Sequence, residues 1–493
     1  MGLGTGQGLH YETAERLSAA LASRTICSVE LVESLLGRAR TIDGKLRAFI
    51  ALDGADALRQ AVESDRRRER GAALGPLDGV AVSIKDNMSV RRWPMSCGSR
   101  MLDGYVSPYD CHVVERLRAA GAIIFGRTNM DEFAMGSSTE NSAFFGTANP
   151  WDLGRVPGGS SGGSACAVAA GLAPLALGTD TGGSVRQPAA FCAAVGLKPT
   201  YGRVSRYGVT AFASSLDQVG PMGRSVWDVA ALLGAIAGLD RRDSTSSPLA
   251  VPDYTVALGR ERRWKIAVPR EVFSDGLDGD VRDGLRRAVD FFAGAGCEIL
   301  DVSMPAMDIS IGAYYITATA EAFSNLSRFD GIRYGHRSKV AGTVGEVYAK
   351  SRGEGFGAEV KRRIMLGAFV LSGGYHEAYY GRAQRARVHI SNGFGEIFRN
   401  CDFIATPTAP TVPFPVGAKT QDPLAMYLSD IYTVSVNLVG LPAISVCCGF
   451  SPQGLPMGLQ LIAKPFHEEE LLAAAAFFER NHDFCRRHPK IDQ

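Results

Sequence analysis

The chain has 493 residues, of which 46% are hydrophobic and 21% charged. These proportions are those of a folded globular protein and exclude a chain that is disordered throughout. Lysine and arginine number 53 against 51 aspartates and glutamates, which gives a net charge of +2. So small a charge argues against a protein whose main task is to neutralise nucleic-acid phosphates.

The N-terminal segment carries Glu12 and Glu15 where a secretory signal would need an unbroken apolar stretch. The longest uncharged runs, 156–179 and 431–463, are interrupted by glycines and prolines. We therefore predict neither secretion nor a membrane span, and we expect a cytoplasmic protein.

The hydrophobic pattern predicts a pair of amphipathic helices within residues 11–40. From about 75 to 221, short apolar segments alternate with glycine-rich turns, a texture typical of α/β folds. The strands predicted in this region are 80–84, 122–125, 175–177 and 195–197.

A serine- and proline-rich stretch at 243–253 is typical of a linker, and the α/β alternation resumes beyond it. Residues 310–400 are mostly helical in pattern. The other predicted elements are strands at 266–268, 297–302, 403–415 and 443–461 and helices at 281–295 and 468–484.

Lys85 ends a segment with strict alternation of apolar and polar residues. Val80, Val82 and Ile84 occupy one face of the predicted strand, and Ser83 and Lys85 occupy the other. A lysine at such a place is ordinarily a surface strand terminus. Held in a dry site, it would lose its proton more readily and could act as a base.

Two glycine- and serine-rich blocks follow. The first, Pro-Gly-Gly-Ser-Ser-Gly-Gly-Ser at 157–164, lets the backbone approach a reacting group closely, although a phosphate nest, a linker or a tight turn is an alternative. It lacks the Gly-Lys-Ser/Thr ending of a P-loop, which disfavours nucleotide binding.

The second block, Leu-Gly-Thr-Asp-Thr-Gly-Gly-Ser-Val-Arg-Gln-Pro at 177–188, predicts a strand, a glycine turn and a helix that starts at about Ser184. The alternative is an ordinary capped helix. In a catalytic site, backbone amides in this turn would surround a developing oxyanion. These amides belong to Thr181, Gly182, Gly183 and Ser184.

A Ser-His-Asp hydrolase is a further alternative, because residues 158–162 match the pattern G-x-S-x-G. The preceding residues 152–157 do not form an apolar strand, as that pattern requires. None of the eight histidines lies in either block, which leaves open a histidine brought near by folding.

Taken together, the lysine-ended strand and the two blocks resemble the amidase signature family, over about residues 10–485. The resemblance implies that Ser184 is the nucleophile, Ser160 a bridging serine in a cis peptide and Lys85 the base. It also implies an α/β fold in a single large domain, 1–493, with a central mixed β-sheet covered by helices on both faces. The signature core would span about 75–225, and a mostly helical insertion about 310–400.

Within this family, segments 126–142, 324–335, 360–367 and 422–430 resemble the glutaminase subunits of tRNA-dependent amidotransferases. By this resemblance Arg363 and Asp430 hold the α-carboxylate and α-ammonium of glutamine, with Tyr314 beside them, a pairing that suits the chemistry of both groups. Without it, Arg363 has the pattern of a surface helix residue, because it lies in a Lys-Arg-Arg run.

The resemblance implies that the chain hydrolyses glutamine to glutamate and ammonia. A partner subunit would use the ammonia, with ATP, to convert Glu-tRNA(Gln) to Gln-tRNA(Gln) or Asp-tRNA(Asn) to Asn-tRNA(Asn). This implies a heterotrimer with subunits B and C that contacts tRNA as a complex, ATP and Mg on the partner, and no cofactor or metal on this chain. The alternatives are a free-standing amidase for a small aliphatic or aryl amide and a catalytically silent scaffold. Residues 91–95 and Phe145 depart from the family pattern, and we expect them near the pocket rim.

Overall fold

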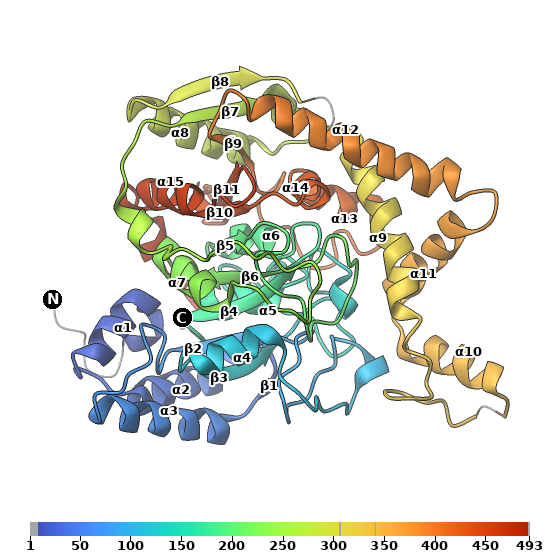
Figure 1. The fold of residues 1–493 in the computed structure, drawn as a ribbon, viewed down its shortest axis with the longest axis horizontal. Helices are drawn as coiled ribbons and strands as arrows, with labels where there is room; N and C mark the ends of the chain where they lie inside the picture. The colour runs from blue at the N-terminus through green and yellow to red at the C-terminus, as the bar shows by residue number, and fades with distance from the viewer. Residues whose placement is uncertain (1–7, 305–306, 341, 492–493) are drawn as a thin grey trace.

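The computed structural model describes residues 8–304, 307–340 and 342–491. Their strands form one sheet of eleven, which crosses the molecule from β8 at one edge to β1 at the other (Figure 1). From that first edge the strands are β8 (Glu298–Val302), β7 (Lys265–Pro269), β9 (Phe403–Pro407), β11 (Pro456–Ala463), β10 (Ala443–Phe450), β5 (Val195–Lys198), β6 (Gln218–Gly223), β4 (Leu175–Asp180), β2 (Ala81–Lys85), β3 (Ile123–Thr128) and β1 (Phe49–Leu52).

The sheet is mixed, as predicted. Strand β2 runs parallel to β3 and β4, and β7 runs parallel to β8 and β9. The central pairs from β4 through β6, β5, β10 and β11 to β9 are antiparallel. Because β2 and β4 are parallel neighbours, their carboxyl ends, Lys85 and Asp180, lie at the same edge of the sheet.

Helices cover both faces of this sheet, which confirms the predicted architecture. Successive residues of β11 point to opposite faces: Gly458 faces Ala190, while Met457 faces Gly284. The helices that carry these two partners are α6 (Arg186–Cys192) and α8 (Gly279–Gly294). Helix α5 (Gly162–Ala169) packs beside α6, and α7 (Val226–Ile236) and α15 (Glu468–Arg480) pack over the central strands.

A group of helices from residues 310–397 stands at one side of the sheet in Figure 1. It comprises α9 (Ser310–Leu326), α10 (Val344–Gly355), α11 (Ala358–Leu371) and α12 (Arg382–Ile397), with one π-helical turn (Glu377–Gly381) before α12. Helix α9 packs against both α11 and α12. The division of the chain into a signature core and a helical insertion remains a proposal.

Near the N-terminus, α1 (Ala14–Ala22) and α2 (Ser28–Leu46) match the predicted helix pair. The sequence pattern missed β1, β6, α3 (Gly54–Glu69), α4 (His112–Ala119) and α7. The predicted strand 403–415 ends at Pro407, because prolines 410, 413 and 415 cannot donate to a strand ladder. The predicted strand 443–461 is a hairpin, β10 and β11, with a turn at 451–455.

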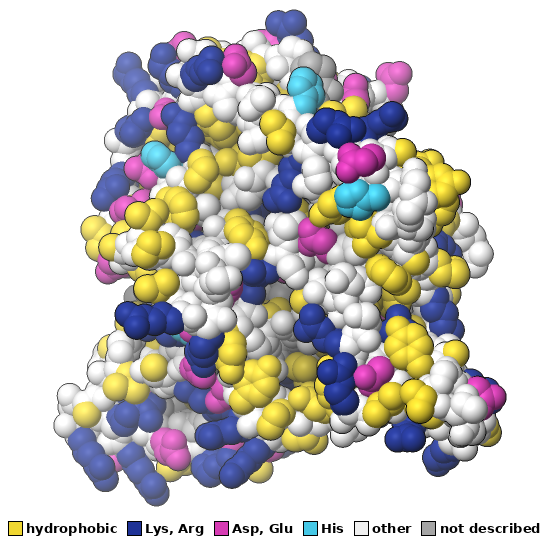
Figure 2. Space-filling model, turned by 45° about the vertical axis from the view of Figure 1, so that its right-hand side comes forward, with side chains coloured by type: hydrophobic (Ala, Val, Ile, Leu, Met, Phe, Trp, Pro, Cys, Tyr) yellow, Lys and Arg dark blue, Asp and Glu magenta, His cyan; other side chains and the backbone are white. Residues whose placement is uncertain are grey.

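On the face shown in Figure 2, lysine and arginine side chains are scattered among apolar and acidic ones. This distribution agrees with the nearly balanced charge of the sequence. Among the described residues, no helix combines the length and the apolar character needed to cross a membrane.

Candidate active site

Lys85 ends β2 in the interior of the protein and is fully buried. Its Nζ donates hydrogen bonds to Ser160 Oγ at 2.7 Å and to Ser161 Oγ at 2.8 Å, and it lies 3.4 Å from the carbonyl oxygen of Thr179. Burial lowers the pKa of Lys85 from its ordinary 10.5 to about 7, against the opposing charges of buried carboxylates. The amine can therefore be neutral near pH 7, as a base requires.

Ser160 sits in the turn before α5, and the Gly159–Ser160 peptide bond is cis, the conformation that the family resemblance implies. Asp131 braces this turn. Its N–H donates to the Ser160 carbonyl at 3.3 Å. Its carboxylate accepts from the backbone N–H groups of Thr139 and Asn141. A side chain at Gly159 would overlap that carboxylate, so glycine is required where the two segments touch.

Ser184 lies in the turn between β4 and α6, and it keeps 8% of its surface exposed, whereas Lys85 and Ser160 have none. Ser161 N–H donates to the Ser184 carbonyl at 3.2 Å, which joins the two glycine- and serine-rich segments. The helix begins at Arg186 rather than at Ser184 as predicted. Ser184 thus belongs to the turn, which leaves its N–H outside the helical ladder.

The predicted oxyanion hole needs one correction. Gly183 N–H already donates to Asp180 Oδ1 at 2.8 Å, so it is not available to a substrate oxygen. Among the described residues, the N–H groups of Thr181, Gly182 and Ser184 donate no such bond. We therefore restrict the predicted oxyanion hole to these three amides.

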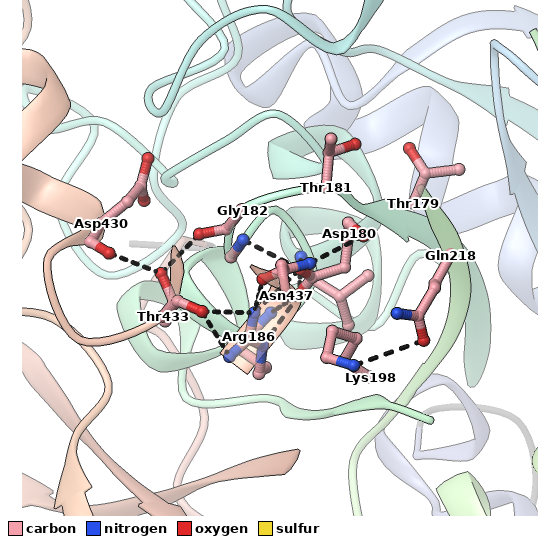
Figure 3. A network of polar contacts seen from close by, with 12 residues as sticks. Thr179, Asp180, Thr181, Gly182, Arg186, Lys198, Gln218, Asp430, Thr433 and Asn437 are labelled. Carbon is pink, nitrogen blue, oxygen red and sulfur yellow. Dashed lines mark hydrogen bonds and ion pairs between the residues drawn. The ribbon is translucent and has the colours of Figure 1, made fainter. Parts of the chain in front are cut away.

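Asp180 anchors the turn through a fully buried ion pair with Arg186, drawn in Figure 3 (Nη2 to Oδ1 2.9 Å, Nε to Oδ2 3.0 Å). Asn437 Nδ2 donates to the same carboxylate at 2.9 Å. Burial alone would raise the pKa of Asp180, but the guanidinium and these hydrogen bonds hold it below its ordinary value. Thr433 Oγ1 in turn donates to the Gly182 carbonyl at 2.6 Å. The turn is thus held by Asp180 and its partners and also by Thr433.

Arg363 is buried on α11, contrary to the surface position that its sequence pattern alone suggests. Its guanidinium lies 5.2 Å from the ring centre of Tyr315, 5.3 Å from that of Tyr427 and 5.7 Å from that of Phe212. Glu359, one turn earlier, accepts from Arg363 Nε at 2.7 Å. Three aromatic faces thus enclose a cation whose one ion-pair partner among the described residues is Glu359.

Asp430 is 7% exposed and lies close enough to Arg363 for the two charges to influence each other. Ser137 Oγ donates to Asp430 Oδ2 at 2.5 Å, whereas Oδ1 is buried and has no hydrogen-bond partner among the described residues. Burial raises the pKa of Asp430 to about 7. An unpaired carboxylate oxygen of this kind favours binding of a cationic group.

Residues 181–184 form the turn that carries the predicted oxyanion amides, which we call the oxyanion turn. Tyr314 on α9 is buried against this turn. A side chain at Gly182 would meet the Tyr314 phenol at 2.5 Å, so the ring and the turn are in direct contact. Tyr314 thus lies beside the turn, and its neighbour Tyr315 beside Arg363. Two of the residues that depart from the family pattern can be placed. Met95 lines a pocket with Tyr105 and Phe329, and the carbonyl oxygen of Phe145 accepts a hydrogen bond from Asn129 Nδ2.

The sequence analysis missed several residues that build this site: Asp131, Ser137, Asp180, Asn437 and Thr433. The position of Asp180 at the end of β4, just before the glycine turn, was a usable signal. Ser137 offered none, because its partner Asp430 lies 293 residues away in the chain. Among the described residues, no group of three or more His, Cys, Asp or Glu could hold a metal ion.

Comparison with known proteins places this geometry in a family. The Amidase family model matches residues 30–472. The A subunit of glutamyl-tRNA(Gln) amidotransferase from Chloroflexus aggregans is 52% identical over 484 residues, which cover 98% of this chain and 99% of that protein. The crystal structure of the A subunit of the same name from Thermotoga maritima has a TM-score of 0.82 at 38% identity and covers 98% of both chains. 6-Aminohexanoate cyclic dimer hydrolase has a TM-score of 0.84 at 26% identity, covering 98% of this chain and 99% of that one. The chain belongs to the amidase signature family.

Proposed function

We propose that this chain is the glutaminase subunit of a glutamyl-tRNA(Gln) amidotransferase. The observation that carries the proposal is that buried Arg363 lies near buried Asp430, whose Oδ1 has no partner among the described residues. Full-length identity of 52% to an A subunit of that enzyme supports the same assignment. A small neutral amide would leave Asp430 Oδ1 without a cationic partner, whereas the α-ammonium of glutamine supplies one and its α-carboxylate suits Arg363.

Glutamine would bind with its α-carboxylate on Arg363 and its α-ammonium on Asp430. Its side-chain amide would then extend toward Ser184, beside Tyr314 and the oxyanion turn. Asp430 must be ionised to hold the ammonium, and its pKa of about 7 places that ionisation in the neutral range. An ammonium beside it favours the ionised form further.

Acyl transfer follows from the residues around Lys85. The neutral amine accepts the Ser160 hydroxyl proton as Ser160 takes the proton of Ser184, and Ser184 Oγ attacks the amide carbon. The amides of Thr181, Gly182 and Ser184 stabilise the oxyanion. The C–N bond breaks as the proton returns through Ser160 to the leaving nitrogen, which departs as ammonia. Water then adds to the glutamyl ester, releasing glutamate and restoring Ser184.

The ammonia would pass to a partner subunit that activates Glu-tRNA(Gln), or Asp-tRNA(Asn), with ATP and Mg. We place these cofactors on the partner, because the glycine-rich blocks of this chain lack a P-loop ending and instead surround Lys85 and Ser184. The proposal therefore includes association with B and C subunits, contact with tRNA through the complex, and a place in the cytoplasm.

The test is ammonia release by the chain alone and after co-expression with B and C subunits, ATP and mischarged tRNA. Aliphatic and aryl amides serve as control substrates. Stimulation by the partners and selectivity for glutamine are expected. Fast hydrolysis of a simple amide by the chain alone, unaffected by partners, would instead identify a free-standing amidase. A glutamine analogue that acylates serine should modify Ser184, and modification of Ser160 would contradict the assigned nucleophile.

A further inference from the structure

A short loop, residues 212–217, connects two parts of the candidate site that lie on different segments. It is organised around the carboxylate of Asp217, which is buried. Asp217 accepts hydrogen bonds from Phe212 N–H at 2.8 Å and from Ala213 N–H at 3.0 Å. The loop therefore closes on its own last residue.

One end of this arrangement reaches the oxyanion turn. Thr181 Oγ1 donates to Asp217 Oδ1 at 2.7 Å, and Thr181 N–H is one of the three amides assigned to the oxyanion. The orientation of that N–H depends on the backbone of Thr181, which its side chain ties to Asp217. Loss of this bond would remove one of the anchors of the turn, beside those through Asp180, Thr433 and Ser161.

The other end reaches the predicted carboxylate-binding group. The Phe212 ring lies 5.7 Å from the Arg363 guanidinium and forms one wall of its aromatic enclosure. Helix α9 holds the same loop from outside: Asn325 Nδ2 donates to the Phe212 carbonyl at 3.2 Å, and Glu321 accepts from Ser215 N–H at 2.9 Å.

The chemistry of Asp217 points beyond a purely structural role. Among the described residues, no lysine or arginine nitrogen lies within ion-pair distance of its carboxylate. A buried carboxylate without a cation is costly, and an asparagine or serine could accept hydrogen bonds from a loop at lower cost. The carboxylate is distinctive in accepting from the loop amides and from Thr181 at the same time.

We propose that Asp217 is a positioning residue that sets both ends of the substrate site. Through Thr181 it orients the oxyanion amides, and through Phe212 it places the aromatic wall of Arg363. This inference rests on the proposed glutaminase function, because only a substrate with an α-carboxylate uses both ends. It predicts that the contact through Thr181 affects kcat and the contact through Phe212 affects KM. A role in folding alone would not separate the two constants in this way.

The experiment measures kcat and KM for glutamine in the complex with its partner subunits. Thr181→Val removes the hydroxyl at nearly constant volume and should lower kcat about tenfold with KM within about twofold, because a misplaced donor weakens transition-state binding. Phe212→Leu should raise KM about fivefold with kcat nearly unchanged, because it removes one ring from the Arg363 enclosure. Asp217→Asn should change both constants.

Thr408→Val is the matched control. Thr408 is equally buried, and its hydroxyl makes one side-chain hydrogen bond, 2.9 Å from Ser445 Oγ, outside the site. It should lower thermal stability to a similar extent while leaving both constants within about twofold of the parent. Thr181→Ser, which keeps the hydroxyl, should recover most of the kcat lost in Thr181→Val.

Two results would overturn the inference: Asp217→Asn with the kcat and KM of the parent, or Thr181→Val indistinguishable from Thr408→Val. A different result addresses the proposed function. If the parent hydrolyses simple amides but not glutamine, that function is wrong. The Thr181 variants measured on such an amide would still test how Asp217 positions the oxyanion turn.

Discussion

Replacement of Lys85 by arginine should abolish the pH dependence that its buried amine creates. With a pKa of about 7, roughly half of the Lys85 side chains are neutral at pH 7, against about one in 3,000 for a lysine at the ordinary 10.5. Burial therefore increases the reactive fraction about 1,500-fold, equivalent to about 4 kcal/mol. As pH rises through 7 the amine loses its proton, so kcat for glutamine should rise and then level off near pH 8.

Arginine stays protonated at any accessible pH, so Lys85→Arg removes the base while keeping a cation in place. We expect kcat to fall by about 10³, within the range of general base catalysis, and the rise near pH 7 to vanish. The assay is ammonia release at saturating glutamine from pH 5.5 to 9. Lys198→Arg is the control, because Lys198 is equally buried with a pKa of about 7 but donates to the Pro199 carbonyl and to Gln218. The contact with Gln218 is drawn in Figure 3. A profile that is flat in the parent, or lost in Lys198→Arg and kept in Lys85→Arg, would refute the assignment of the base.

Three further predictions concern the same site. Asp430 must ionise to bind an ammonium, so KM for glutamine should fall as pH rises through about 7. Asp430→Asn should raise KM about 100-fold and remove this pH dependence of KM, while the pH profile of kcat remains. An unchanged KM would contradict the assigned contact. Gly183→Ala should lower the free energy of unfolding by about 1–3 kcal/mol in urea titrations and reduce kcat, because φ is +137° there and a Cβ would lie 2.2 Å from Thr433 Oγ1; full stability would show that the turn adapts. Lys85→Met should raise the free energy of unfolding by about 2 kcal/mol at pH 7, since it removes a buried amine that costs about 4 kcal/mol and loses two hydroxyl bonds worth about 1 kcal/mol each. The folded chain binds fewer protons than the unfolded chain between pH 7 and 10.5, so this gain should shrink toward pH 10, and a gain independent of pH would contradict the buried-amine explanation.

Much of the fold was predictable because its strands alternate clearly or form short apolar runs. Strand β6 was not, since its sequence, Gln-Val-Gly-Pro-Met-Gly, has the composition of a turn. It nevertheless lies in the middle of the sheet, between β4 and β5. Its glycine content has a steric reason. A Cβ at Gly220 would lie 2.3 Å from the Leu197 carbonyl, so only glycine fits there. Composition alone cannot reveal a constraint imposed by a neighbouring strand.

In the candidate site, too, some features follow from the local sequence and others depend on distant segments. Alternation placed Lys85 at a strand end, but its complete burial depends on α5 and the turn before it, some 75 residues later in the chain. The burial of Arg363 depends on rings from three distant segments, at positions 212, 315 and 427. Family resemblance identified both residues, whereas local pattern identified neither as buried. The burial of each charged side chain is decided by long-range packing, which leaves no pattern in the local sequence.

Burial gives the base its neutral form, and the ion pair between Asp180 and Arg186 limits the opposing effect of one nearby carboxylate. Three buried carboxylates, on Asp131, Asp180 and Asp217, each raise the pKa of Lys85, and burial lowers it. Asp180 ends the strand that pairs with β2, so its charge would favour a protonated lysine if it stood alone. Arg186 offsets that charge within 2.9 Å, and the same guanidinium holds the oxyanion turn in place. Loss of Arg186 alone would therefore favour the protonated base and at the same time remove an anchor of the oxyanion turn.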